Sequence, residues 1–156
     1  MEHPMKKFRF TLDAVRVVRQ REEKEALESY SSALLARQKA LDRLEEVRLQ
    51  QAEAAEQTRQ EMSAGCTAGR LRQRQSFHES LRISLRECEG RLVLAETVQQ
   101  GAMQRLVQAK QRREVVDKAF ERQHAGHQKA VMVEEAHLLD ELAQRQLPTA
   151  LRWQNA

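Results

Sequence analysis

The chain has 156 residues, of which 32% are charged and only 4% are aromatic, and its formal net charge at pH 7 is +4. So few large side chains cannot fill the interior of a globular domain, and the composition favours long helices that bury a thin apolar stripe. Because no stretch approaches the roughly 18 apolar residues that cross a bilayer, and the first ten residues lack the apolar run of a secretory signal, we expect a cytoplasmic protein.

Proline is confined to the ends of the chain, at Pro4 and Pro148, which leaves 143 consecutive residues without it. Because proline inside a helix costs about 3 kcal/mol, this distribution permits helix throughout the interior. The one cluster that would interrupt a helix is residues 62–69, which contain Gly65 and Gly69. We therefore expect a single domain of residues 1–156, with helices over about 11–62 and 70–146 and a turn over about 63–69.

The first expected helix carries a weak apolar repeat. Steps of three and four residues visit Leu27, Tyr30, Leu34, Arg37, Leu41, Leu44, Arg48, Gln51, Ala55, Thr58 and Met62. An earlier stripe is rotated relative to it and consists of Leu12, Val15, Val18 and Ala26. This rotation predicts a shift of phase near Glu22.

The second expected helix carries the strongest periodic signal of the chain. The same steps visit Leu81, Leu85, Cys88, Leu92, Ala95, Gln99, Ala102, Leu106, Ala109, Arg113, Val116 and Phe120, and ten of these twelve residues are apolar. Such spacing is typical of coiled coils. Two stripes joined by a short turn predict an all-α fold, a long two-helix antiparallel coiled-coil hairpin with unequal arms.

The unequal arms predict an unpaired helix end. At 1.5 Å per residue the first helix would be roughly 75 to 80 Å long and the second roughly 115 Å. With the turn at Gly65, Thr11 should lie opposite Phe120 or Glu121, so residues 122–146 should have at most the N-terminal segment beside them. This part still contains Val131, Met132, Val133, Leu138, Leu139 and Leu142.

An apolar stripe on an unpaired helix predicts a binding partner. Each side chain left in water forgoes roughly 1.5 to 3 kcal/mol of burial. The alternatives are a frayed end or self-association of two chains, and Gly126 together with a change of phase between Phe120 and Val131 would favour fraying.

The residues that could carry chemistry form no recognisable site. The five glycines form neither GxGxxG nor GxxxxGK[ST], and the carboxylates lie on narrow helices without a cleft, so we expect neither an enzyme nor a cofactor. His124 and His127 could share a helix face, with further candidate ligands at Glu134, Glu135 and His137. A solvated polar face is a far commoner explanation of such spacing than a metal site.

Charge is distributed in blocks. Residues 6–21 hold six bases, among them Lys6, against one acid, and residues 70–86 hold five arginines against one acid, while residues 134–141 are acidic. A basic face can meet nucleic acid, anionic lipid or an acidic protein, or be solvated. Interleaved acids and the scarcity of aromatic residues beyond Tyr30 and Trp153 argue against direct nucleic-acid binding.

Several segments resemble one known family, in register over nearly the whole chain. They are FRFTL at 8–12, RQREEKEAL at 19–27, MSAG at 62–65 leading to QSF at 75–77 and Leu81, and Glu135 with LLDELA at 138–143. Together they resemble the FliJ family of flagellar export proteins. The resemblance implies a cytoplasmic, non-catalytic antiparallel coiled coil, similar to the central stalk of rotary ATPases. It would insert into a hexameric export ATPase and link the ATPase to the membrane export gate.

The resemblance also implies partner surfaces. The paired termini would face the ATPase, and the candidate contacts there are Val131, Glu135, Leu138, Leu139 and Leu142. The positions that match the family's surface for the cytoplasmic domain of the gate are Val47, Phe77 and Leu81. Contact with the membrane would be peripheral only, and export chaperones are a further class of partner.

Charge suggests an additional contact at the paired end. We hypothesise that Arg16, Arg19 and Arg21 meet an acidic surface inside the ATPase ring.

Two other functions stay open. One is the equivalent stalk of a non-flagellar type III secretion system, and the other is a coiled-coil scaffold or an export chaperone. A scaffold would form a stable dimer through the unpaired helix end. A stalk would be mostly monomeric alone and would bind one copy to each ATPase ring.

Overall fold

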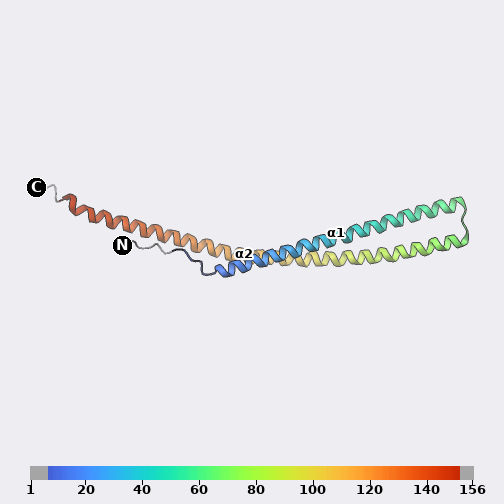
Figure 1. Cartoon of the computed structure of the whole chain (residues 1–156), viewed down its shortest axis with the longest axis horizontal. Coiled ribbons are helices and arrows are strands. Elements are labelled where there is room, and N and C mark those ends of the chain that lie inside the picture. Colours follow the sequence, from blue (N-terminus) through green and yellow to red (C-terminus); the bar gives the residue numbers. More distant parts are fainter. Residues whose placement is uncertain (1–6, 152–156) are drawn as a thin grey trace. The chain divides into compact units, whose positions relative to one another are not determined.

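The computed structural model describes residues 7–151 and the side chains of residues 7–145, so that Pro4, Lys6 and Trp153 lie outside it. In this part the chain forms two α-helices, α1 (Asp13–Ala64, 52 residues) and α2 (Ala68–Leu151, 84 residues), joined by residues 65–67 (Figure 1). The predicted all-α hairpin with unequal arms is confirmed.

The turn is short because the residues between the helices suit a helix end and a helix start. Gly65 follows α1 with a φ of +86°, a conformation that costs side-chain-bearing residues energy, and its N–H donates to the Met62 carbonyl at 3.3 Å. At the start of α2, the Thr67 hydroxyl accepts a hydrogen bond of 3.3 Å from the Arg70 N–H and caps the helix. Only three residues are therefore needed to reverse the chain.

The two glycines of the turn region should respond oppositely to alanine. Gly65→Ala should lower the free energy of unfolding by about 1 to 2 kcal/mol, because alanine disfavours a left-handed conformation. Gly69 is helical with open space around its Cα, so Gly69→Ala should be neutral or should stabilise by up to about 1 kcal/mol. Urea unfolding followed by helical circular dichroism compares the two, and equal effects would contradict this account of the turn.

Contacts divide the chain into two compact units. The turn unit, Glu22–Lys110, contains the connection between the helices. The termini unit contains Met1–Arg21 and Gln111–Ala156, of which residues 7–21 and 111–151 are described.

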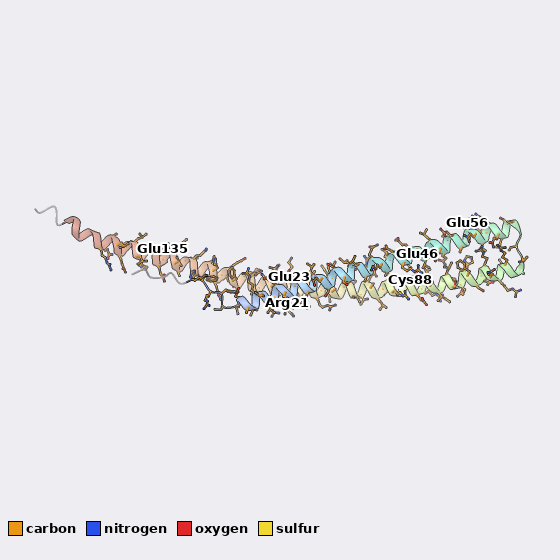
Figure 2. The ribbon with its side chains drawn as sticks, viewed as in Figure 1. Arg21, Glu23, Glu46, Glu56, Cys88 and Glu135 are labelled. Atoms are coloured by element: carbon orange, nitrogen blue, oxygen red, sulfur yellow. The ribbon has the colours of Figure 1, made fainter. Side chains whose placement is uncertain are left out.

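The turn unit has a narrow core between its helices. Leu44, Val47 and Cys88 form a buried cluster, against which Leu85 and Leu92 pack (Cys88 and the nearby Glu46 are labelled in Figure 2). The predicted stripe of α2 is confirmed along its whole length, because all twelve positions from Leu81 to Phe120 are buried or half-buried. The spacing of apolar residues therefore determines which face of α2 pairs.

The predicted stripe of α1 is confirmed at seven of its eleven positions. From Ala26 onward, the buried and half-buried positions of α1 are Ala26, Tyr30, Ala33, Arg37, Ala40, Leu41, Leu44, Val47, Gln51, Ala54, Ala55, Thr58 and Glu61. Every second predicted position has a covered residue directly before it. Of these six predicted positions, Leu41 and Ala55 are half-buried, and Leu27, Leu34, Arg48 and Met62 are exposed. Four of the six covered residues directly before those positions are alanines, Ala26, Ala33, Ala40 and Ala54, and their small side chains take up little volume between the helices.

Polar pairs across the turn unit show the antiparallel alignment. Arg37 pairs with Glu96 at 3.5 Å and Arg48 with Glu89 at 3.7 Å, so later residues of α1 meet earlier residues of α2. Arg74 also pairs with Glu61. Ion pairs as exposed as those of Arg37 and Arg48 contribute little stability, so the buried stripe supplies most of the free energy of pairing.

Candidate partner-binding surfaces

In the termini unit, α1 meets α2 through polar side chains. Arg16 and Arg19 are half-buried, whereas Leu12, Val15 and Val18 are exposed. The predicted rotated stripe is therefore wrong at Leu12, Val15 and Val18, although its fourth member, Ala26, is half-buried, and the predicted phase shift near Glu22 is wrong. Covered positions instead recur every three or four residues from the later part of α1 back to Arg16. Arginine can occupy such positions because its long aliphatic stem packs on the partner helix while its guanidinium pairs with acidic side chains.

Arg16 is held by a polar cluster. Its Nε donates to Asp117 Oδ1 at 2.9 Å, and Arg113 Nη1 donates to Asp117 Oδ2 at 2.5 Å. The Arg16 guanidinium also lies 4.3 Å from the centre of the Phe120 ring, a cation–π contact. The residue predicted to meet an acidic partner is thus already paired within the chain.

Stability should depend on pH through Asp117. Burial alone raises the pKa of its carboxyl, but the hydrogen bonds from Arg113 and Arg16 outweigh burial and hold that pKa below its ordinary value. A lowered pKa in the folded state means that the stabilisation is present at neutral pH and is lost as the pH falls through the folded-state pKa. Asp117→Asn should therefore lower the melting temperature at pH 7 but make little difference near about pH 2.

The matched control for that series is Asp140→Asn, a change at an exposed carboxylate of α2. It should leave the melting temperature unchanged at every pH. If the Asp117 variant still melted at a lower temperature than the parent chain in acid, its effect would not come from the ionised carboxylate.

Residues 7–12, the N-terminal strap, precede α1 and pack against α2. The ring of Phe8 meets the rings of Phe120, His124 and His127 edge-on, at centroid distances of 5.7, 5.1 and 5.4 Å. Phe10 lies 5.2 Å from Phe120. These contacts form an aromatic cluster that fixes the strap beside residues 120–127.

Thr11 lies close to its predicted position along α2. Gln123 Nε2 donates to the Thr11 hydroxyl at 3.4 Å, within a few residues of the predicted alignment of Thr11. A pocket of about 500 Å³ opens beside the cluster and is lined by Phe8, Arg9, Phe10, Thr11, Asp13 and Phe120. His124 and His127 contact Phe8, and no three metal-ligating side chains gather anywhere in the described part of the chain.

Beyond the strap, α2 continues as the exposed arm, residues 128–145. Val131 is half-buried, and every residue from 132 to 145 is exposed, including Leu138 and Leu142. The other exposed large apolar residues of the arm are Met132, Val133 and Leu139. The arm also carries four acids, among them Glu135 (labelled in Figure 2), against two bases, Lys129 and Arg145. It is an acidic surface with a broad apolar face.

The predicted change of phase in α2 is present. The covered positions of this stripe are Val116, Phe120, His124, His127 and Val131, and the first two steps, from Val116 to Phe120 and from Phe120 to His124, are both of four residues. Such spacing departs from the heptad repeat of the preceding stripe.

The candidate gate residues lie in different environments. Val47 and Leu81 are buried between the helices of the turn unit, whereas Phe77 is 46% exposed. Only Phe77 therefore offers its side chain to a partner in this conformation.

The aromatic cluster and the Asp117 cluster were missed from the sequence, and the signal that could have found the first was the FRF run opposite Phe120.

Comparison with known families agrees with this architecture. The model of the flagellar FliJ protein family matches residues 8–151, which is nearly the whole chain. Searches of curated proteins and of solved structures found no match. No helix in the described residues is long and apolar enough to span a membrane. The matched segment includes both helices and their turn, and the chain therefore belongs to the flagellar FliJ family, a family of the flagellar protein export apparatus.

Proposed function

We propose that this protein is the non-enzymatic central stalk of a flagellar type III export ATPase complex. It would insert its paired termini into a hexameric ATPase ring and connect the ring to the cytoplasmic domain of the membrane export gate. The observation that carries the proposal is the exposed arm, where an apolar face with Leu138 and Leu142 is left open to solvent.

The ATPase contact would be made by the termini unit. Val131, Glu135, Leu138, Leu139 and Leu142 all belong to its α2 segment, and four of them are apolar. Arg19 and Arg21 add positive charge on α1, while Arg16 acts through Asp117 by holding the two helices together. A surface that combines apolar area with charge suits specific binding to a protein partner.

The gate contact would be made by the turn unit through Phe77. Val47 and Leu81 would support this surface from beneath, because both are buried in the core that positions α2. The protein would be cytoplasmic and would reach the inner membrane only through the export apparatus, with export chaperones as further partners.

Sedimentation velocity with and without the hexameric export ATPase tests the proposal. We expect a monomer alone and one copy per ring in the mixture, with no ATP hydrolysis by the chain itself. A stable dimer that ignores the ATPase would instead support a coiled-coil scaffold or an export chaperone. The flagellar family match favours the flagellar apparatus over the equivalent stalk of a non-flagellar secretion system.

A further inference from the structure

One face of α2 runs from the aromatic cluster into the exposed arm. The half-buried positions Phe120, His124, His127 and Val131 lie on it, and the same steps lead to Glu135, Leu138 and Leu142. At about 100° per residue, Phe120 and Leu142 differ by only about 40° around the helix axis. The covered and the exposed residues therefore belong to a single surface.

The N-terminal strap covers the first half of this surface. It lies outside α1, and its Phe10 and Leu12 carbonyls accept backbone hydrogen bonds from Asp13 and Arg16 at the start of that helix, whereas side-chain contacts hold the strap on α2. These are the edge-on ring contacts of Phe8 and Phe10 and the 3.4 Å hydrogen bond between Gln123 and Thr11. Such a segment can leave without unfolding either helix.

The helix pairing next to the strap is also easy to open. Arg16 and Arg19 occupy the positions that alanine, leucine and valine occupy farther along α1. The Arg16 and Asp117 side chains remain 31% and 22% exposed, so their ion pair is partly solvated and contributes modestly. Few apolar contacts oppose separation of the start of α1 from α2.

We infer that the N-terminal strap is a removable cover on the partner-binding face of α2. In the free chain the strap occupies the face from Phe120 to His127. The ATPase binds the exposed arm, and it displaces the strap when the ATPase contact extends along the same face of α2. The inference rests on the proposed function. The complementary ATPase surface would be an apolar groove or helix with bases at its edge, since Glu135 lies on this face and Glu134 and Glu141 flank it.

Displacement can be measured with two spin labels on the full-length chain. Arg9→Cys and Arg122→Cys place exposed labels on the strap and on α2, in a Cys66→Ser background in which the buried Cys88 stays unreactive. We expect a short, narrow distance distribution in the free chain that lengthens and broadens when the hexameric ATPase is added. An unchanged distribution in a chain that has bound the ATPase would overturn the inference and leave the proposed function intact.

Affinity gives an independent readout. Phe8→Ser with Phe10→Ser removes the rings that hold the strap, so the double variant should bind the ATPase roughly tenfold more tightly, because a competing contact is gone. Leu94→Ser with Val98→Ser, at exposed positions of the turn unit, is the matched control and should not change affinity. Weaker or equal binding by the strap variant would overturn the inference. Failure of every form to bind would refute the proposed function, and the inference with it.

Discussion

Replacing Val47 by aspartate will lower the free energy of unfolding by roughly 3 to 5 kcal/mol, a large part of the stability of a small domain. Val47 is 1% exposed and belongs to the buried cluster with Leu44 and Cys88. A carboxylate there would be desolvated without a charged partner in the cluster. Thermal melting followed at 222 nm should show a marked drop in the melting temperature.

The control is Leu49→Asp, two residues along the same helix, where the side chain is 65% exposed. It places the same aspartate on the same helix, and surface changes of this kind usually shift the free energy of unfolding by less than about 0.5 kcal/mol. Equal damage from both variants would mean that the helices do not pair through Val47.

Loss of the apolar face of the exposed arm should have the largest effect on function. Leu138→Gln with Leu142→Gln removes two leucines that are 52% and 55% exposed in the free chain, so the melting temperature should hardly change. If the ATPase buries both side chains, the double change loses roughly 3 to 6 kcal/mol of binding free energy, which raises the dissociation constant at least about a hundredfold. Titration with labelled protein measures the affinity.

A matched double variant separates this effect from a general loss of apolar surface. Leu94→Gln with Val98→Gln has the same spacing on α2, and both side chains are exposed in the turn unit. This variant should bind the ATPase as the parent chain does. Wild-type affinity in the Leu138 and Leu142 variant would rule out the exposed arm as the ATPase contact.

The sequence predicted α2 better than α1 for a physical reason. From Leu81 to Phe120 the apolar residues recur at one spacing, so periodicity alone identifies the buried face. On α1 the largest apolar residues, such as Leu27 and Leu34, stand directly after Ala26 and Ala33. Hydrophobicity favours burial of the leucines, whereas a close approach of the two helices favours burial of the alanines. The periodicity of one helix does not reveal the distance between two helices, so it could not decide between them.

The termini unit was harder to predict because its contacts depend on the alignment of distant segments. Arg16 and Asp117 lie 101 positions apart, and their pairing follows only after the register of the whole hairpin is known. The packing of Phe8 on His124 and His127 requires a non-helical strap, which helical periodicity does not describe. The exposed arm, in contrast, followed from the lengths of the two helices.

The candidate gate residues show the limit of transferring positions by resemblance. Val47, Phe77 and Leu81 match one surface of the family, yet the packing of α1 against α2 buries the first and the last. A position can therefore correspond in sequence while its side chain serves the hairpin itself.

The thin pairing surface makes the covalent connection energetically important. Of the nine buried apolar residues in the described part, four are alanines, which offer little area to hold two separate helices together. The three-residue link keeps the helices of the turn unit at an effective concentration in the millimolar range or above. A single proteolytic nick at the exposed Cys66 would convert pairing from an intramolecular to a bimolecular equilibrium, and dilution would then separate the fragments.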